Sequence, residues 1–356
     1  MGIGNVQAQV GPAKKDVFLW DTLPSLPDTI GYAGSFAGVA DDVLIVAGGS
    51  NFPNGGTPWN GGTKTWYNKL FVLESPGAEW KVAGTLPFNL GYGVSVSTSK
   101  GLLLIGGSNE AGHVADVFLV RYCNQKVELT TMPSLPFALA NSSGAQVGNK
   151  VFVAGGLATP SSPSSEKKFL CLDLDEENGK WKELPPWPGP SRMLAVAGAD
   201  DNNFFLFSGT ELVDGKRAYL KDAYSFSEQK GWTRLADLPL SVVAAPSPAF
   251  LSSKKELFIF GGDSGKDAAI AATLKEKHPG FNTEILRYKV KEDVWSIAGN
   301  VFTHKKENAV TAPNNSIWAP VTTTLAVWKN KIVLPGGEVR PGTRTPRVLT
   351  AKPQAK

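Results

Sequence analysis

A short apolar run that ends in two glycines, or once in Ser-Gly, occurs six times in this 356-residue chain and limits its possible folds more than any other feature. The six copies occupy residues 44–49, 102–107, 151–156, 204–209, 257–262 and 332–337, and the fourth ends in Ser208–Gly209. Each run is too short for a helix and rich in residues that favour strands, so each predicts a buried strand. The glycine pair predicts a tight turn, in which a Cβ would clash or φ is positive.

A tryptophan strand follows most of the repeats. Trp80, Trp181 and Trp232 each lie in a predicted strand that leads into a Leu-Pro turn. Trp295 keeps the tryptophan without the Leu-Pro, and Val127 replaces the tryptophan in another copy. We expect these tryptophans to lie in the core, where they bridge neighbouring repeats.

This pattern resembles the kelch motif over nearly the whole chain. The resemblance implies an all-β, six-bladed kelch-type β-propeller, in which each blade is a four-stranded antiparallel sheet. The last repeat has predicted strands near 323–328, 331–335 and 347–350 but lacks a tryptophan strand, and an unmatched one lies at 17–20. We therefore predict that the N-terminal strand joins the last blade and closes the ring without an exposed edge.

Composition limits the organisation and the partners of the chain. We expect one propeller domain over residues 16–356, preceded by a flexible segment at 1–15. The hydrophobic fraction of 42% excludes a disordered chain, and no apolar run is long enough for a membrane-spanning helix. The net charge of +4, without basic runs interleaved with aromatic residues, predicts no nucleic-acid partner. We also expect no membrane partner. Residues 1–15 lack the apolar stretch of a signal peptide. We expect a periplasmic or secreted protein whose signal has been removed, with a cytoplasmic protein as the alternative.

Cysteine and histidine are scarce. Cys123 and Cys171 form no CxxC motif, and we expect buried free thiols, with a disulfide as the alternative. The three histidines, His113, His278 and His304, are scattered along the chain, so we predict no metal site.

Loop lengths predict which face of the propeller is functional. Turns between the first and second strands are short, as at 41–42 and 329–330, whereas 50–66, 263–281 and 300–319 are long. The long loops follow the glycine pairs or link the blades, and both classes emerge on one face. Binding sites of propellers usually lie on such loops around the central channel. The alternative is that long loops merely tolerate insertions.

The last repeat carries the strongest chemical signal. Glu338 follows Gly336–Gly337 directly, and Arg340 and Arg344 come two and six positions later. A carboxylate near cations stays ionised and can accept a proton, and a guanidinium can bind a carboxylate through two parallel hydrogen bonds. The alternative interpretation is a loop salt bridge.

Residues 337–345, which read Gly-Glu-Val-Arg-Pro-Gly-Thr-Arg-Thr, resemble the active-site stretch of the N-acetylneuraminate epimerases, or sialic acid mutarotases. The resemblance implies that Glu338 is the proton acceptor and that Arg344 binds substrate. It also places a second substrate arginine at Arg192, in the turn Gly-Pro-Ser-Arg at 189–192. The implied protein is an isomerase that interconverts the α and β anomers of N-acetylneuraminate by acid–base ring opening and closure. The implied partner is an acidic sugar, with no cofactor and no obligate protein partner.

Segment order resembles one branch of that family. Residues 34–49 and 92–107 resemble segments near the C-terminus of the better-known members, so we predict a circularly permuted order. Residues 51–66 also look like the permuted branch.

Further polar residues follow the Gly-Gly turns and could contact substrate or merely cap the turns. They are Asn51, Asn109, Glu110, Glu211 and Asp263. We include Asn51 and Glu110, together with Arg340, among the substrate-binding candidates; the alternative for Arg340 is an exposed ion pair.

Histidines and aromatic residues of the long-loop face are weaker candidates. We interpret His113 and His278 as surface histidines. Tyr92 begins an innermost strand, where it could line the channel mouth, although core packing is favoured. Trp59 or Trp66, in the first long loop, could stack on a sugar.

Three other functions compete. The main alternative is a kelch propeller that binds proteins or carbohydrates without catalysis. A copper radical oxidase would need a Tyr–Cys crosslink and two histidine ligands. A sialidase-like hydrolase would need Asp-box repeats, which the sequence lacks.

Overall fold

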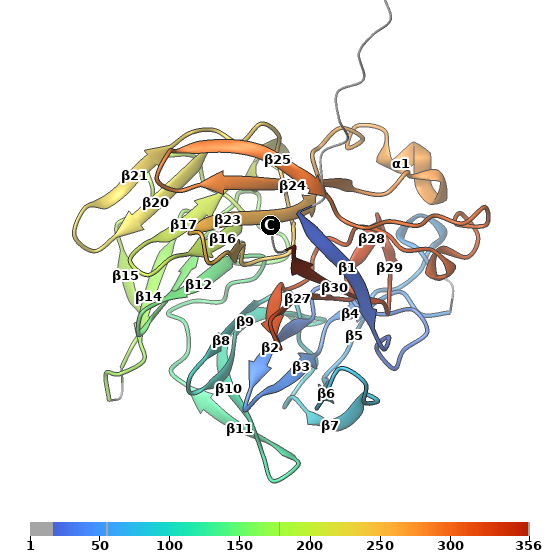
Figure 1. Cartoon of the computed structure of the whole chain (residues 1–356), viewed down its shortest axis with the longest axis horizontal. Coiled ribbons are helices and arrows are strands. Elements are labelled where there is room, and N and C mark those ends of the chain that lie inside the picture. The colour runs from blue at the N-terminus through green and yellow to red at the C-terminus, as the bar shows by residue number, and fades with distance from the viewer. Residues whose placement is uncertain (1–16, 55, 178, 355–356) are drawn as a thin grey trace, which may run out of the picture.

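The computed structural model describes residues 17–54, 56–177 and 179–354 (Figure 1). These residues form a six-bladed β-propeller, as predicted, in which each blade is a four-stranded antiparallel sheet. The predicted flexible segment at 1–15 lies outside the described residues. No helix in the described part of the chain has the length and apolar character needed to cross a bilayer.

Each blade runs from an innermost strand at the channel to an outermost strand at the periphery. Blade 1 consists of β2 (Phe36–Ala40), β3 (Val43–Ala47), β6 (Lys69–Leu73) and β7 (Lys81–Thr85). Blade 2 consists of β8 (Val94–Thr98), β9 (Gly101–Asn109), β10 (Gly112–Cys123) and β11 (Lys126–Met132). Blade 3 consists of β12 (Ser143–Val147), β13 (Lys150–Ala154), β14 (Phe169–Asp173) and β15 (Lys182–Leu184). Blade 4 consists of β16 (Val196–Ala199), β17 (Phe204–Phe207), β20 (Ala223–Ser227) and β21 (Gly231–Leu235). Blade 5 consists of β22 (Phe250–Leu251), β23 (Glu256–Gly262), β24 (Asn282–Lys289) and β25 (Val294–Asn300). Blade 6 consists of β26 (Ala326–Trp328), β27 (Lys331–Pro335), β30 (Val348–Pro353) and β1 (Phe18–Leu23).

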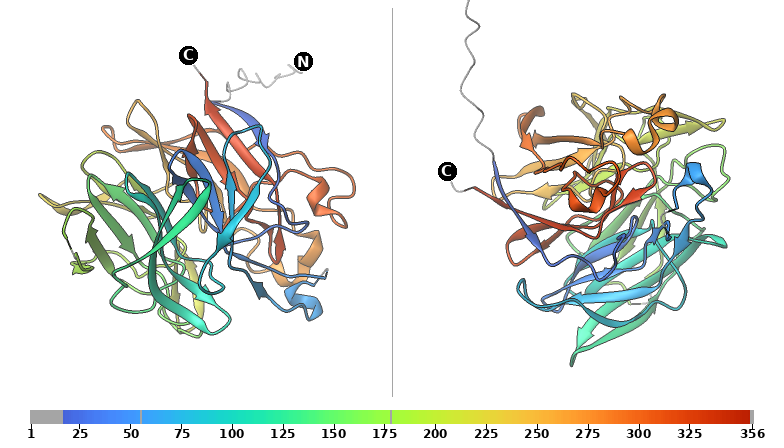
Figure 2. Two further views of the ribbon diagram at one scale, coloured as in Figure 1. Left: turned by 90° about the horizontal axis from the view of Figure 1, so that it is seen from below. Right: turned by 90° about the vertical axis from the view of Figure 1, so that its right-hand side faces the viewer.

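The N-terminal strand closes the ring, which confirms the prediction. β1 is the outermost strand of blade 6 and pairs antiparallel with β30, from Phe18 opposite Pro353 to Leu23 opposite Val348. Figure 2 shows β1 in blue beside the red C-terminal strand. Phe18 is buried against Phe258 and Phe260 of blade 5, so the closing strand also seals the joint between the last two blades.

The glycine pairs form the tight turns that the repeat predicts. Gly336 and Gly337 have φ angles of 65° and 108°, and a Cβ on Gly337 would lie 2.7 Å from the carbonyl oxygen of Val321. Ser208, which replaces the first glycine of the fourth pair, also has a positive φ of 54°. Its hydroxyl donates to the carbonyl of Leu220 at 2.8 Å, which helps the side chain fit the turn.

A closed ring of six backbone hydrogen bonds joins the blades at the channel mouth. Each blade contributes one residue, whose amide donates to the carbonyl of the residue from the preceding blade at 2.7–2.8 Å. All six have positive φ. The mouth ring consists of Gly34, Tyr92, Asn141, Leu194, Ala244 and Thr322. Next to the ring, small residues of all six blades line a cavity of about 80 Å³, consistent with the narrow channel expected from the innermost strands.

The repeat tryptophans bridge neighbouring blades, as predicted. The indole nitrogens of Trp80, Trp181 and Trp232 donate to the carbonyls of Pro24, Pro133 and Pro185, just after the outermost strand of the preceding blade, at 2.8–2.9 Å. Trp295 bonds the carbonyl of Ala236 in the same way. Their expected burial was wrong for most of them: Trp181 is buried, but Trp80, Trp232 and Trp295 are only partly buried. An outermost strand has no further strand to cover it, so its tryptophan keeps one side exposed.

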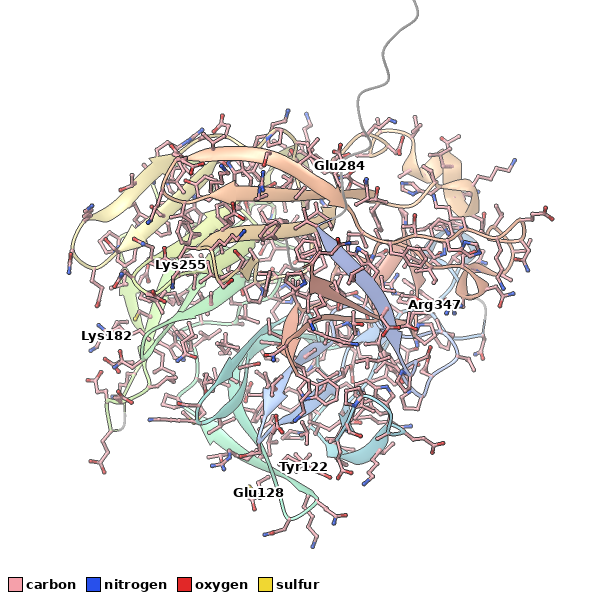
Figure 3. The ribbon with its side chains drawn as sticks, in the orientation of Figure 1. Tyr122, Glu128, Lys182, Lys255, Glu284 and Arg347 are labelled. Carbon is pink, nitrogen blue, oxygen red and sulfur yellow. The ribbon has the colours of Figure 1, made fainter. Side chains whose placement is uncertain are left out.

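Charged side chains cover the periphery. Glu128 on β11 and Lys182 on β15 lie on exposed outermost strands (Figure 3). Lys182 pairs with Glu176 at 2.9 Å, and both side chains are largely exposed. Such pairs contribute little to stability. Both cysteines are free thiols, as predicted; Cys171 is buried and Cys123 is partly buried.

The long loops gather on the face that carries the mouth ring. They hold the hairpins β4 (Ser50–Asn51) with β5 (Thr65–Trp66), β18 (Thr210–Val213) with β19 (Lys216–Tyr219), and β28 (Glu338–Arg340) with β29 (Thr343–Arg344), together with the helices η1 (Pro58–Asn60), α1 (Ala271–Leu274), η2 (Lys275–Lys277) and η3 (Pro313–Asn315). In Figure 1, β4, β5, β28, β29 and α1 lie on the same side of the molecule. The long loops of blades 5 and 6 therefore approach the first long loop.

Candidate functional site

The repeat brings the residue after each Gly-Gly turn to the channel mouth. In every blade this residue forms a β-bridge with the residue just before the mouth ring. The six residues are Ser50, Ser108, Leu157, Thr210, Asp263 and Glu338. Glu338 bridges Val321, so it lies beside Thr322 of the ring. The fold thus places side chains of five residue types at six equivalent positions, and two of the six are carboxylates.

A short hairpin brings Glu338 and Arg344 together. β28 and β29 pair Glu338 directly with Arg344 across the strands. Oε1 of Glu338 accepts hydrogen bonds from the amide of Gly342 at 2.7 Å and from Nη1 of Arg344 at 3.3 Å. The Glu338 side chain is 19% exposed and that of Arg344 is 4% exposed. The carboxylate therefore remains accessible from the mouth, while the cation beside it is shielded from solvent.

Arg344 reaches from this hairpin to residues of blades 1 and 2. Its Nη2 donates to the hydroxyl of Tyr92 at 3.3 Å, and its guanidinium lies 4.8 Å from the ring centre of Phe52. Burial alone would lower the pKa of Arg344, but the neighbouring Glu338 and Tyr92 oppose this and the pKa is raised. Arg344 is thus a permanent cation. Its buried Nε has no hydrogen-bond partner among the described residues, so one donor stays free.

Tyr92 lies between two cations. Its hydroxyl is 3.3 Å from Arg344 Nη2 and 3.2 Å from the hydroxyl of the buried Ser50. Lys64 Nζ lies 4.0 Å from the centre of the Tyr92 ring and 4.2 Å from that of Trp66, and the two aromatic rings pack edge to face. A cation over an aromatic face is attracted to it. The expected core packing of Tyr92 is therefore incomplete, since its hydroxyl belongs to the mouth.

His113 is partly buried beside this cluster and is not the surface histidine that we expected. Its Nδ1 lies 3.0 Å from the hydroxyl of Ser108, and its buried Nε2 has no partner among the described residues. Burial and the nearby Lys64 lower the pKa of His113 to about 4, so the ring is neutral at physiological pH. His278 is also buried rather than exposed, and its Nδ1 accepts from the amide of Gly280.

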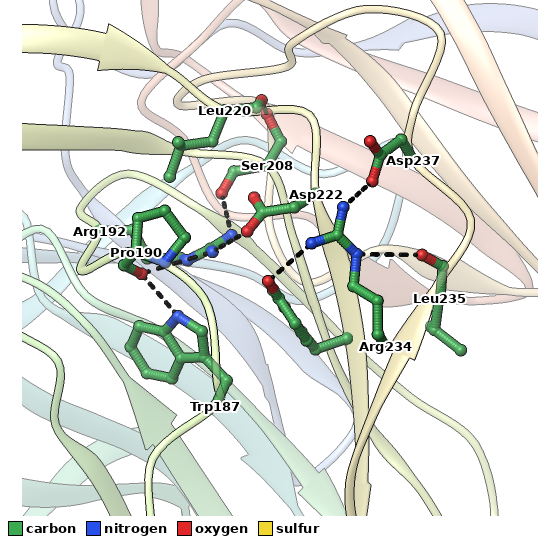
Figure 4. Close-up of polar contacts among 10 residues, drawn as sticks. Trp187, Pro190, Arg192, Ser208, Leu220, Asp222, Arg234, Leu235 and Asp237 are labelled. Atoms are coloured by element: carbon green, nitrogen blue, oxygen red, sulfur yellow. Dashed lines mark hydrogen bonds and ion pairs between the residues drawn. The ribbon is translucent and has the colours of Figure 1, made fainter.

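Arg192, the second arginine expected to bind substrate, does not join the contact between Glu338 and Arg344 and is buried elsewhere. The side chain is 0% exposed, and its Nη2 donates to Oδ2 of Asp222 at 2.6 Å. Its Nη1 donates to the carbonyl of Ser208 at 2.8 Å, and the guanidinium packs over the rings of Trp187 and Tyr224 (Figure 4). Arg192 lies on the segment that links blade 3 to blade 4, and its side chain binds that segment to Ser208 and Asp222 of blade 4.

Arg340 and Asn51 are likewise committed to the protein. Arg340 is 2% exposed and donates to the backbone carbonyls of Glu276 and Ala309, so it fastens two long loops to blade 6. Asn51 is fully buried, where it donates to the carbonyl of Gly31 and accepts from the hydroxyl of Tyr67. In this structure both side chains bind the protein itself, and neither joins the contact between Glu338 and Arg344.

The remaining candidates lie at the edge of the site. Glu110 is exposed on the β9–β10 turn and accepts a hydrogen bond from Asn89. Asp263 occupies the position equivalent to Glu338, but its carboxylate accepts from the hydroxyl of Tyr219 and the amide of Gly265. Trp59 donates to Glu276, which fixes its ring against η2.

Sequence reasoning missed Ser50, Phe52 and Lys64. All three lie in or beside the first long loop, and Lys64 precedes Trp66 by two residues, a spacing that places both on one side of a strand. That spacing was the available signal for Lys64. Nothing local in the sequence connects Phe52 or Ser50 with the hairpin of blade 6.

The arrangement can perform acid–base chemistry on an anionic ligand. It offers the accessible carboxylate of Glu338 and the buried guanidinium of Arg344, whose Nε donor is free among the described residues. The phenol hydroxyl of Tyr92 accepts a hydrogen bond from the same guanidinium. No cluster of three metal-ligating side chains occurs in the part of the chain that the structure describes.

The chain is similar in sequence to known N-acetylneuraminate epimerases. The family model for N-acetylneuraminate epimerase matches residues 2–129 and 132–356. An N-acetylneuraminate epimerase of Haemophilus influenzae (strain 86-028NP) is 27% identical over 248 residues, which cover 64% of this chain and 60% of the relative. The epimerase of Pasteurella multocida (strain Pm70) is 32% identical over 127 residues, or 31% of this chain and 33% of that protein. The epimerase of Yersinia enterocolitica serotype O:8 is 39% identical over 90 residues, or 23% of this chain and 22% of that protein.

The chain thus spans 60% or less of the length of these relatives in the aligned regions. The family model, in contrast, covers nearly every residue, including the Glu338–Arg344 hairpin. On this match, together with the six-bladed propeller, the chain belongs to the N-acetylneuraminate epimerase family.

Proposed function

We propose that this protein interconverts the α and β anomers of N-acetylneuraminate, with Glu338 as proton acceptor and Arg344 as the residue that holds the substrate carboxylate. The observation that carries the proposal is the contact between Glu338 and Arg344 at the channel mouth. The family match and the names of the relatives support the substrate class.

Arg344 fixes the reacting centre. In sialic acid the carboxylate is bonded to the anomeric carbon, so a guanidinium that grips it by two hydrogen bonds also fixes that carbon. The buried Arg344 is a strong partner because water competes poorly for its donors. Glu338, on the same guanidinium, then lies beside the anomeric hydroxyl.

Glu338 moves the proton. Its carboxylate takes the proton of the anomeric hydroxyl, and that oxygen forms a carbonyl. The bond from the anomeric carbon to the ring oxygen breaks, and the ring oxygen keeps the electron pair and takes up a proton. Rotation of the open chain presents the other face of the carbonyl while the substrate carboxylate stays bound. On ring closure the attacking hydroxyl gives up its proton, and Glu338 returns its proton to the carbonyl oxygen, which becomes the new anomeric hydroxyl. Acid–base assistance of this kind typically contributes about 10²–10⁴-fold.

Proton NMR tests the proposal. A sialidase releases α-N-acetylneuraminate, and its decay to the β anomer is followed with and without this protein. We expect acceleration by the wild type and its loss in Glu338→Gln and Arg344→Ala. Glu128→Gln is the matched control, because this exposed carboxylate lies on the peripheral strand β11, away from the channel mouth. If Glu338→Gln still accelerates the reaction, Glu338 is not the proton acceptor. If the wild type has no effect on the reaction, N-acetylneuraminate is not the substrate.

A further inference from the structure

The two ends of the Arg344 guanidinium each hold a group that can exchange a proton. Nη1 lies 3.3 Å from Oε1 of Glu338, and Nη2 lies 3.3 Å from the hydroxyl of Tyr92. A carboxylate bound along the guanidinium would therefore have the Glu338 carboxylate on one side and the Tyr92 phenol on the other. The anomeric carbon bears two oxygens that need opposite proton transfers, the hydroxyl and the ring oxygen.

The backbone of Tyr92 is fixed by the mouth ring. Its amide donates to the carbonyl of Gly34 at 2.7 Å, and its carbonyl accepts from the amide of Asn141 at 2.8 Å. Its φ of 58° is unusual for an aromatic residue and is held by this ring of hydrogen bonds. Trp66 and Lys64 pack on its side chain. The hydroxyl is thus held in place before substrate binds.

The hydrogen bonds of the phenol leave its own proton available. Arg344 can only donate, so the Tyr92 oxygen accepts from it. The other neighbour is the hydroxyl of Ser50 at 3.2 Å, which can donate to or accept from Tyr92. When the Ser50 hydroxyl donates, the phenol proton is free to point at a ligand oxygen.

The surroundings favour the charge that forms when this proton leaves. A phenolate at Tyr92 would lie in hydrogen-bond contact with the Arg344 cation. The ammonium of Lys64 lies 4.0 Å from the centre of the same ring. Two fixed cations beside a developing negative charge stabilise it without reorganisation of solvent.

We propose that Tyr92 is the general acid that protonates the ring oxygen, opposite Glu338 as base; this inference rests on the proposed function. As the bond from the anomeric carbon to the ring oxygen breaks, the oxygen keeps the electron pair and takes the phenol proton. The chain is then left with a Tyr92 phenolate and a protonated Glu338. On closure the phenolate takes the proton back from the attacking hydroxyl, and Glu338 returns its proton to the carbonyl oxygen. No proton or electron is gained or lost.

The test is Tyr92→Phe in the same NMR assay, which keeps the ring and removes only the hydroxyl. We expect kcat to fall about 10²-fold with KM nearly unchanged. Tyr122→Phe is the control; it removes a phenol that contacts Glu74 on the periphery and should leave both constants unchanged. Thermal unfolding checks that both variants fold.

A second readout separates proton donation from a structural role. 3-Fluorotyrosine at position 92 has a more acidic phenol and should shift the alkaline limb of the kcat–pH profile to lower pH. Full activity of Tyr92→Phe, a loss confined to KM, or an unmoved alkaline limb would each overturn the role of Tyr92 while leaving the proposed function intact. A wild type that does not accelerate mutarotation would overturn both.

Discussion

Oε1 of Glu338 lies 3.3 Å from Nη1 of Arg344, across a hairpin in which these residues face each other directly. The hairpin follows a Gly-Gly turn and is anchored to Val321, next to the mouth ring. A carboxylate and its cation are therefore fixed at the channel mouth by backbone bonds, and their side chains need little rearrangement to meet an anionic ligand.

Arg344→Lys should weaken substrate binding more than it slows the chemical step. Lysine keeps the positive charge but loses the planar fork that grips a carboxylate with two bonds. We expect KM for N-acetylneuraminate to rise about tenfold or more, the equivalent of about 1.4 kcal/mol, with a smaller fall in kcat. Initial rates at several sugar concentrations measure both constants; a fall confined to kcat would contradict the binding role.

Gly34→Ala should displace Tyr92. A Cβ at this position would lie 2.5 Å from Cδ2 of Tyr92, and Gly34 has a φ of 68° that disfavours a side chain. The added methyl group would press on the Tyr92 ring near Cγ, where rotation of the side chain cannot move the ring away from it. We expect a fall in kcat comparable with that of Tyr92→Phe and a modest loss of stability. Gly215→Ala is a matched control, because this glycine has a φ of 73° but no atoms near its Cβ position. Equal kcat in the two variants would contradict the prediction.

Arg192→Met should damage stability rather than catalysis. The substitution leaves the buried carboxylate of Asp222 without its cation, which typically costs about 3–5 kcal/mol. Urea unfolding measures the loss, and kcat and KM of the folded fraction should match the wild type. The double variant Arg192→Met/Asp222→Leu should recover much of the stability because no buried charge remains. A raised KM with unchanged stability would instead return Arg192 to the substrate site.

Acid should destabilise the protein in part through His113. Its pKa falls from 6.5 in the unfolded chain to about 4 in the folded one, so below pH 6.5 the unfolded chain binds a proton that the folded chain does not. The free energy of unfolding therefore decreases from pH 6.5 to pH 4, by about 2 kcal/mol after allowance for partial exposure.

Urea unfolding of the wild type and His113→Gln at intervals between pH 4 and pH 7 measures this contribution. The variant should lose this part of the pH dependence and keep the rest. Parallel curves for the two proteins would show that His113 is not the titrating group.

Much of the fold could be predicted from the sequence because its signals are local. The six apolar runs and their glycine pairs specify strands and tight turns within a few residues. The lone tryptophan strand at the N-terminus predicted the closure that β1 and β30 form. Glu338 and Arg344 could be placed together for the same reason, since only the turn of one hairpin separates them.

Only the tertiary structure decided which other side chains join them. Tyr92 is 252 positions from Arg344 in sequence, and the closed ring brings the two together at the channel mouth. Like Arg344, Arg192 and Arg340 lie within three residues of a glycine and a proline, so their local sequences are similar. The direction of each side chain depends instead on packing between blades and loops. In Arg192 and Arg340 the Nη atoms donate to buried acceptors of the protein, whereas the Nη atoms of Arg344 contact an accessible carboxylate and a phenol. A sequence pattern specifies the period and the turns, but the neighbours of a side chain are set by ring closure.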